Sequence, residues 1–258
     1  MLVQKLNTAQ LLIEKISPSA AKVNYVDNDT LSKALSFLDK NGFPNNKNEE
    51  YKYCNVESIL KKEFKNIEQR FISEIDLSRN RIPDTMRIIV LNGIYRNDLS
   101  DKIFQKGISI KSLSELNDSE RPNLGSLVNV ESDAFTALCT AFSEDGFYLK
   151  IESNLVCEKT IHVLFINSSY SESVVNTRYF LELKENSKLN LIEEQIQFGE
   201  GKVFSNYLSE KIVGENSSLN TCTVQNCGEQ SFSANNSTVQ LKYNSNYHNT
   251  TVTLSGSL

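Results

Sequence analysis

The sequence has no tryptophan, only two histidines and no long apolar run. None of its apolar stretches approaches the roughly 18 residues that a membrane-spanning helix needs. Its start, MLVQKLNTAQLLIEKI, lacks the basic flank, apolar core and small-residue cleavage site of a secretory signal. We therefore expect a cytoplasmic protein without a membrane contact.

Basic surface is missing as well. The formal net charge is -5, and no stretch is rich in Lys or Arg without interleaved Asp and Glu. Proteins that bind nucleic acid neutralise phosphates with such a surface, so the sequence predicts no nucleic-acid partner. Hydrophobic residues make up 39% and charged residues 23%, which is ordinary for a chain that buries a core.

Motifs for catalysis and metal binding are absent too. Gly199-Glu200-Gly201 has no GxxxxGK[ST] or GxGxxG context, and no sequence resembles a nucleophile elbow. His162 and His248, the only histidines, have no HxxxH or CxxC pattern beside them. We expect neither an enzyme nor a catalytic, cofactor-binding or metal-binding residue in this chain.

The cysteines number five, which is odd: Cys54, Cys139, Cys157, Cys222 and Cys227. In a reducing compartment they remain thiols and form no disulfide framework. Cys222 and Cys227 have a spacing found in some iron–sulfur sites, but no third or fourth ligand follows. We interpret each cysteine as structural, with Cys222 as a small apolar residue of an alternating strand in the solenoid core.

Two acidic pairs, Glu49-Glu50 and Glu193-Glu194, are candidates for general acid/base work. Neighbours along a strand point to opposite faces, so Glu193 and Glu194 cannot share a cleft. We expect both pairs at the solvated surface.

Aromatic residues gather near position 50, where Tyr51 and Tyr53 flank Lys52 and follow Phe43. They form either an aromatic surface for a partner or packing between short helices. The sequence leaves these two interpretations open.

The first part of the chain reads as helical. Apolar spacing predicts helices over Val3–Ile16 and after Asp27 or Asp29, the latter stopped by Gly42 and Pro44. A third follows Asn55, and another lies around 132–142. Between them, RIIVLNGIY carries a turn signal in its Asn-Gly pair.

After residue 145 the sequence alternates and no helix is expected. Predicted strands are 147–151, 161–166, 179–183, 189–193, 219–225 and 252–254. Asn, Ser and Gly separate them.

An internal repeat runs through these strands. ENSKLNLIEEQ (Glu185–Gln195) realigns on ENSSLNTCTVQ (Glu215–Gln225) with an offset of 30, and YNSNYHNTTVT (Tyr243–Thr253) follows with an offset of 28. Such repeats predict stacked coils of a β-helix, in which the Asn-Ser pair forms a turn. Chance similarity between strands of a β-sandwich is the alternative. The chain ends directly after a strand without a second cap, so we expect a truncated solenoid.

Several segments, in order, resemble the SufD branch of the SufB/SufD family. FPNNKNEEYKYCNVESIL (Phe43–Leu60) is similar to its N-terminal block, with Tyr51 and Cys54 in place of the usual Trp and Thr. RIIVLNGIYRNDLS (Arg87–Ser100) and the segment Ala137–Ile166 are similar to later blocks, and the Glu185 and Glu215 repeats resemble its coils.

This resemblance implies a mainly β protein with an α-helical N-terminal domain (1–130) and the first coils of a right-handed parallel β-helix (131–258). It implies a non-catalytic scaffold of the Suf iron–sulfur cluster assembly complex, working with SufB and the ATPase SufC. Those partners would dock through C-terminal regions missing here. The chain itself would hold no cofactor, although the complex handles iron–sulfur clusters, and a homodimer in isolation is a further state that the resemblance allows.

A β-helical carbohydrate-active or adhesin-like protein is the alternative from another class. It predicts a secretion signal and ladders of aromatic or carboxylate side chains, and the signal is absent. A purely structural solenoid without Suf partners is the third possibility.

Overall fold

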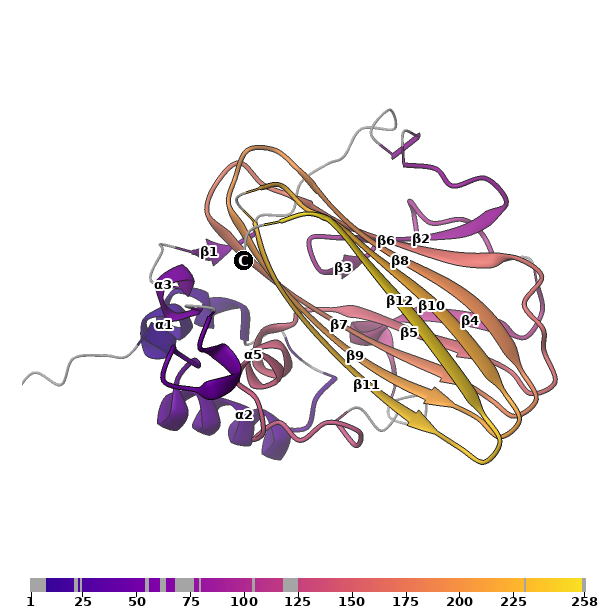
Figure 1. The fold of residues 1–258 in the computed structure, drawn as a ribbon, viewed down its shortest axis with the longest axis horizontal. Helices are drawn as coiled ribbons and strands as arrows, with labels where there is room; N and C mark the ends of the chain where they lie inside the picture. Colours follow the sequence, from indigo (N-terminus) through magenta and orange to yellow (C-terminus); the bar gives the residue numbers. More distant parts are fainter. Residues whose placement is uncertain are drawn as a thin grey trace, which may run out of the picture.

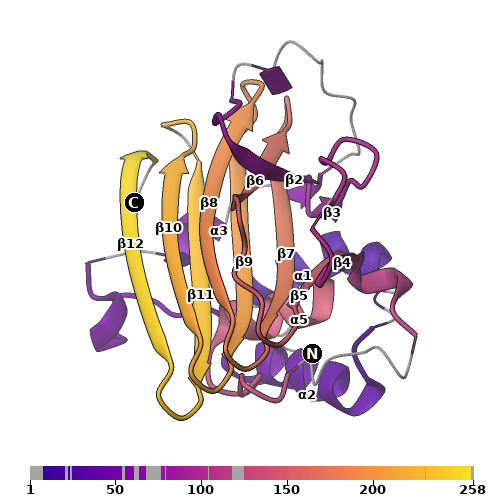
Figure 2. The same cartoon turned by 90° about the vertical axis from the view of Figure 1, so that its right-hand side faces the viewer.

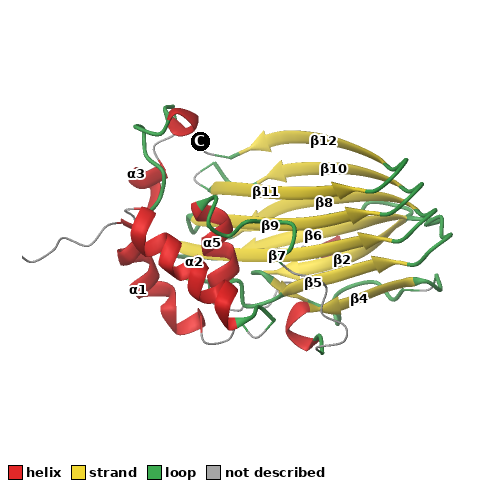
Figure 3. Cartoon of the chain, turned by 90° about the horizontal axis from the view of Figure 1, so that it is seen from below, coloured by secondary structure: helices red, strands yellow, loops and turns green. Residues whose placement is uncertain are grey.

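The chain folds into a helical part set against two packed β-sheets, as a computed structural model shows (Figure 1). In Figure 3 the helices gather at one side, and the strands run away from them. The structure describes residues 8–20, 23, 25–53, 56–60, 64–67, 77–78, 80–103, 105–117, 125–229 and 231–256.

The helical part begins with α1 (Thr8–Ala20), α2 (Asn28–Asn41), the 3-10 helix η1 (Glu49–Tyr51) and α3 (Val56–Leu60). α1 runs past its predicted end at Ile16, while its predicted start at Val3 lies outside the described residues. α3 confirms the helix predicted after Asn55, and Leu60 at its end is buried. No described helix is both long and apolar enough to cross a membrane.

The ends of α2 follow from its flanking residues. The carboxylate of Asp27 accepts a hydrogen bond from the Thr30 N–H at 2.9 Å, which satisfies an otherwise unpaired donor of the first turn. Gly42 closes the helix at φ 67°, and its N–H donates to the Leu38 carbonyl. The prediction of a helix between Asp27 and Gly42 is confirmed.

Short strands lead from the helices into the sheets: β1 (Lys65–Asn66), β2 (Thr85–Leu91), β3 (Ile94–Tyr95) and β4 (Ile108–Ser112). β2 and β3 form an antiparallel hairpin through Asn92 and Gly93, whose φ angles of 50° and 81° suit a type I′ turn. The 3-10 helix η2 (Leu113–Glu115) and the helix α5 (Ala134–Phe142) follow. α5 confirms the helix predicted around 132–142.

From residue 146 the chain forms eight strands in succession: β5 (Gly146–Ile151), β6 (Thr160–Ser168), β7 (Ser173–Leu183), β8 (Lys188–Phe198), β9 (Val203–Val213), β10 (Ser218–Asn226), β11 (Phe232–Leu241) and β12 (Asn246–Ser255). They alternate between one sheet ordered β11-β9-β7-β5-β4 and another ordered β12-β10-β8-β6-β2-β3. Figure 2 shows the coils stacked side by side up to β12. Each strand pairs in parallel with the strand two along, so 146–255 is a β-solenoid of about four turns, as predicted.

The repeat in the sequence is the repeat of the coils. Leu189 pairs with Leu219, and Leu219 with Tyr247, which are the predicted offsets of 30 and 28. The turn residues Asn186, Asn216 and Asn244 have φ angles of 55°, 55° and 52°, the left-handed geometry expected of them. Stacked Asn side chains also bond to each other, with 2.8 Å between Asn244 Nδ2 and Asn216 Oδ1.

The central strands of the first sheet, β7 and β9, are buried on both faces. Its inner face packs against the other sheet in the solenoid core, which includes Phe147, Leu181 and Leu191. Its outer face packs under α1, α2 and α5 through Val174 and Phe204. This double burial explains why β9 was not predicted, because polar residues on a covered face remove the alternation that marks a half-exposed strand.

Candidate functional site

The interior of the solenoid changes from apolar to polar along the stack. The first coils fill it with residues such as Phe147, Leu149 and Leu181. From β7 onward, polar side chains also face the interior: Tyr179, Glu193, Gln195, Ser209, Lys211, Thr223 and Asn235. Charged groups are rarely placed inside a core unless they are paired, so this polar lumen is the first candidate site.

Glu193 is the centre of the polar lumen. Lys211 Nζ lies 2.9 Å from its Oε1, and the two side chains are only 2% and 7% exposed. The Thr223 hydroxyl donates to Glu193 Oε2 at 2.9 Å, and the Tyr179 hydroxyl donates to Oε1. Lys211 Nζ also lies 5.5 Å from the centre of the Tyr179 ring. Both carboxylate oxygens are therefore satisfied.

The surroundings hold this pair in its charged form. Burial acts to raise the pKa of Glu193, but the Lys211 charge and the hydrogen bonds outweigh it and lower the pKa. Burial acts to lower the pKa of Lys211, but the interactions with Tyr179 and Glu193 outweigh the effect of burial and raise this pKa. Burial and the adjacent carboxylate raise the pKa of Tyr179. The arrangement is an ammonium–carboxylate pair with a neutral phenol beside it.

A cavity of about 160 Å³ lies next to the pair and is lined by side chains of β6 to β12, most of them polar. The amides of Gln195 and Asn235 face it and bond to each other at 2.6 Å. Thr221 donates to Asn249 Oδ1 at 2.6 Å near the same end. The cavity offers donors and acceptors without a nucleophile paired to a base.

A second buried ion pair lies on the outer face of the same sheet. Arg178 Nη2 lies 2.6 Å from Glu210 Oε1, and both side chains are fully buried. Glu210 also accepts the N–H groups of Gly125 and Leu127. Burial acts to lower the pKa of Arg178, but the Glu210 charge outweighs it and raises the pKa. This pair fastens the loop before α5 to the solenoid.

The interpretation of Glu193-Glu194 as solvated surface is wrong for Glu193. The alternation expected of the pair does hold, because Glu193 faces the lumen while Glu194 lies on the outer face, 2.9 Å from His162 Nε2. The sequence contained the signal for this. Leu189 and Leu191 face inward, so a period of two places Glu193 on the same face.

The cysteines are dispersed. Cys139 and Cys227 are buried, Cys157 and Cys222 are half-buried, and Cys54 lies outside the described residues. The placement of Cys222 inside the core is wrong, since Thr221 takes the inward position beside it. Among the described residues, no three His, Cys, Asp or Glu side chains converge in a way that could hold a metal ion.

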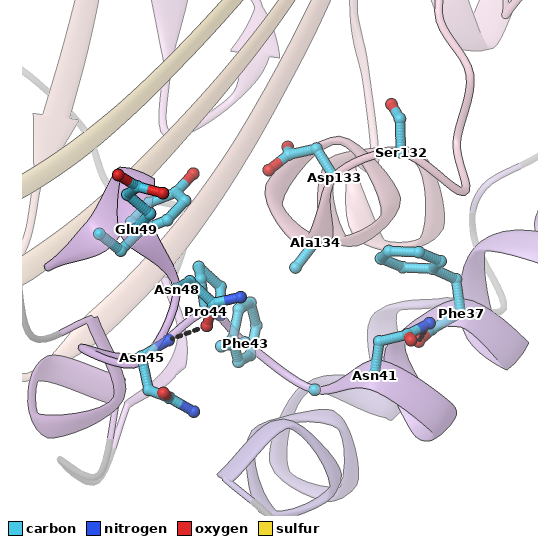
Figure 4. Close-up of a pocket in the computed structure, with 12 residues that line it drawn as sticks. Phe37, Asn41, Phe43, Pro44, Asn45, Asn48, Glu49, Ser132, Asp133 and Ala134 are labelled. Carbon is cyan, nitrogen blue, oxygen red and sulfur yellow. Dashed lines mark hydrogen bonds between the residues drawn. The ribbon is translucent and has the colours of Figure 1, made fainter.

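A second candidate site is a pocket of about 560 Å³ in the helical part, between the end of α2, the segment 43–51 and the start of α5 (Figure 4). Phe43 and Tyr51 line it and pack on Phe135, with ring centres 5.8 and 6.3 Å apart. Packing is therefore the role of Phe43 and Tyr51, whereas Tyr53 is 94% exposed and its role as a partner surface stays a prediction. Sequence reasoning missed this pocket because its walls come from segments about 90 residues apart.

Comparison with known families gives two matches that together span nearly the whole chain. Residues 10–163 match the SufBD protein N-terminal region. The chain belongs to the SufB/SufD family. Residues 165–258 match its core domain, described as SUF system FeS cluster assembly, SufBD core domain. No curated protein matches the chain.

Membership gives the chain its general role. The SufB/SufD family is a non-catalytic component of iron–sulfur cluster assembly, and both family regions describe SufB and SufD together. The cluster is the cargo of this machinery. In the solenoid, the SufBD core domain corresponds to β7 through β12, which contain both buried ion pairs.

Proposed function

We propose that this chain is a SufD-type scaffold subunit, which joins SufB and the ATPase SufC to build iron–sulfur clusters. Support for SufD comes from the block Phe43–Leu60, which resembles the N-terminal block of that branch and shapes the pocket of the helical part. The proposed role of the chain is to hold its partner subunits in position, and no residue of this chain is assigned to catalysis or to a bound cofactor.

The edges of the solenoid support an assembly role. Among the described strands, β11 and β12 each pair on one side only, with β9 and β10. Unpaired backbone groups on such edges pair readily with further strands. Val252 and Leu254 on β12 are also exposed apolar residues.

For the domain organisation we propose residues 1–130 as the helical N-terminal domain and 131–258 as the coils. β2 and β4 come from the first part but pair with β6 and β5 of the second. The two parts therefore share one core, and we expect them to unfold together.

The test is co-expression of the chain, as its gene encodes it, with SufB and SufC of the same genome, followed by size-exclusion chromatography. A SufD subunit co-elutes with both partners, and it does so without replacing SufB. If the chain elutes alone while SufB and SufC form a complex, the scaffold proposal fails. If it replaces SufB in that complex, the chain is SufB.

A further inference from the structure

The pocket of the helical part has a charge of one sign. Among the residues that the structure describes, Glu49 and Asp133 are the only charged residues in its lining, and no Lys or Arg lines it. Negative charge repels nucleic acid and anionic membrane surfaces and attracts cations. The complementary ligand is therefore a cation. The volume of about 560 Å³ falls within the range of roughly 300–1,000 Å³ that is usual for ligand sites.

Both carboxylates retain hydrogen-bonding capacity. The bonds from Thr136 N and Asn236 Nδ2 to Asp133, at 2.8 and 2.6 Å, both end on Oδ2, which leaves Oδ1 without a partner among the described residues. Glu49 is exposed, and its carboxylate bonds to no described residue. Figure 4 shows the two side chains on different walls, one from η1 and one from the start of α5.

The rest of the lining suits a long, partly apolar side chain. Phe37, Phe43 and Tyr51 supply aromatic surface, and Phe43 and Tyr51 are held by Phe135. Aromatic faces attract a guanidinium and pack against its methylene stem. Asparagine side chains at the rim supply donors and acceptors that match a peptide backbone.

We propose that this pocket binds an arginine-bearing segment of a partner protein. The guanidinium lies between Glu49 and Asp133, and its stem packs against the aromatic wall. Asp133 is well placed for this, since it caps α5 and is bonded to Asn236 of β11, which fixes that wall to the solenoid. The site is distinct from the solenoid edges, and its test does not depend on whether the chain is SufD or SufB.

The test passes a mixture of hexapeptides over the immobilised full chain, with arginine fixed at a central position and the flanks randomised. A parallel mixture carries citrulline, the neutral isostere of arginine. Mass spectrometry identifies the retained peptides, and fluorescence anisotropy then compares the best arginine peptide with its citrulline twin. We expect the arginine form to bind about tenfold more tightly or better, because charge-assisted hydrogen bonds are the strong ones.

Two isosteric variants locate the binding. Glu49→Gln and Asp133→Asn each remove one charge, and asparagine is also a good helix cap, so both variants should fold, which thermal unfolding checks. Each variant should bind the arginine peptide with about tenfold lower affinity than the unmodified chain. Glu131→Gln is the matched control, an exposed carboxylate close in sequence but outside the lining, and should change affinity less than about twofold. The proposal is overturned if citrulline peptides bind equally well, or if Glu131→Gln weakens binding as much as Glu49→Gln.

Discussion

The Glu193–Lys211 pair allows a sharp test of how charge is held inside the solenoid. Lys211→Met keeps most of the side-chain length but leaves a buried carboxylate without its cation. Removing one partner of a buried pair costs about 3–5 kcal/mol. The hydrogen bonds from Tyr179 and Thr223 remain, so we expect the lower end, about 3 kcal/mol. For a chain of this size that corresponds to a fall in Tm of roughly 6–12 °C.

The effect of pH on this variant follows from the charges. In the unmodified chain the pKa of Glu193 is lowered, so its contribution is present above the ordinary value of 4.5 and is lost only as pH falls through the lowered pKa. The pKa of Lys211 is raised, so its contribution is present below the ordinary 10.5 and is lost as pH rises through the raised pKa. The contribution of the pair to the free energy of unfolding is therefore constant between about pH 5 and about pH 10. In Lys211→Met the lowering effect of the Lys211 charge is lost, and only the two hydrogen bonds oppose the effect of burial, so the pKa of Glu193 is higher than in the unmodified chain. The loss of stability caused by the substitution is therefore smaller at about pH 5 than at about pH 8.

The assay is thermal unfolding followed by far-ultraviolet circular dichroism at both pH values. Lys188→Met is the control, because it makes the same substitution at an exposed lysine and should change stability by less than about 0.5 kcal/mol. The double variant Glu193→Gln/Lys211→Met should recover most of the loss, since no unpaired charge remains. A fall in Tm below about 2 °C for Lys211→Met, or an equal fall at both pH values, would refute the reasoning.

Three further predictions concern turns, packing and thiols. Asn216→Ala should lower stability by about 1 kcal/mol, because φ is 55° there, while Asn216→Gly should be tolerated in the same thermal assay. Gly146→Ala should prevent accumulation of folded protein in the soluble fraction, because an added Cβ would lie 1.6 Å from the Arg178 carbonyl oxygen. Burial raises the pKa of Cys139 to about 12, so iodoacetamide near neutral pH should leave it unmodified in the native chain and label it in urea; rapid native labelling, read by peptide mass spectrometry, would contradict its burial.

The sequence predicts the parts of this fold that depend on local backbone geometry better than the parts that depend on contacts between distant residues. Asn216 and its two counterparts mark turns through local backbone geometry, which sequence alone carries, so the coil length is predictable from them. β9 was missed because its polar residues have tertiary partners on both faces. Glu210 pairs outward with Arg178 and Lys211 pairs inward with Glu193, and neither partner is near in sequence. The pocket at Glu49 and Asp133 depends in the same way on contacts between distant segments.

These two ion pairs together specify the register of β9. Glu210 and Lys211 are adjacent, and their partners lie on opposite faces of the sheet, Arg178 under the helices and Glu193 in the lumen. A slip of one residue would exchange the faces of every side chain in the strand. A slip in one direction would put Glu210 in the place of Lys211, beside Glu193, and a slip in the other direction would put Lys211 in the place of Glu210, beside Arg178. Either slip therefore creates a like-charge contact in a buried setting. A buried ion pair adds little net stability over apolar packing, so we infer that these two pairs act mainly by making the slipped register of β9 unfavourable. The register of β9 in turn determines which of its backbone groups pair with the next coil of the solenoid.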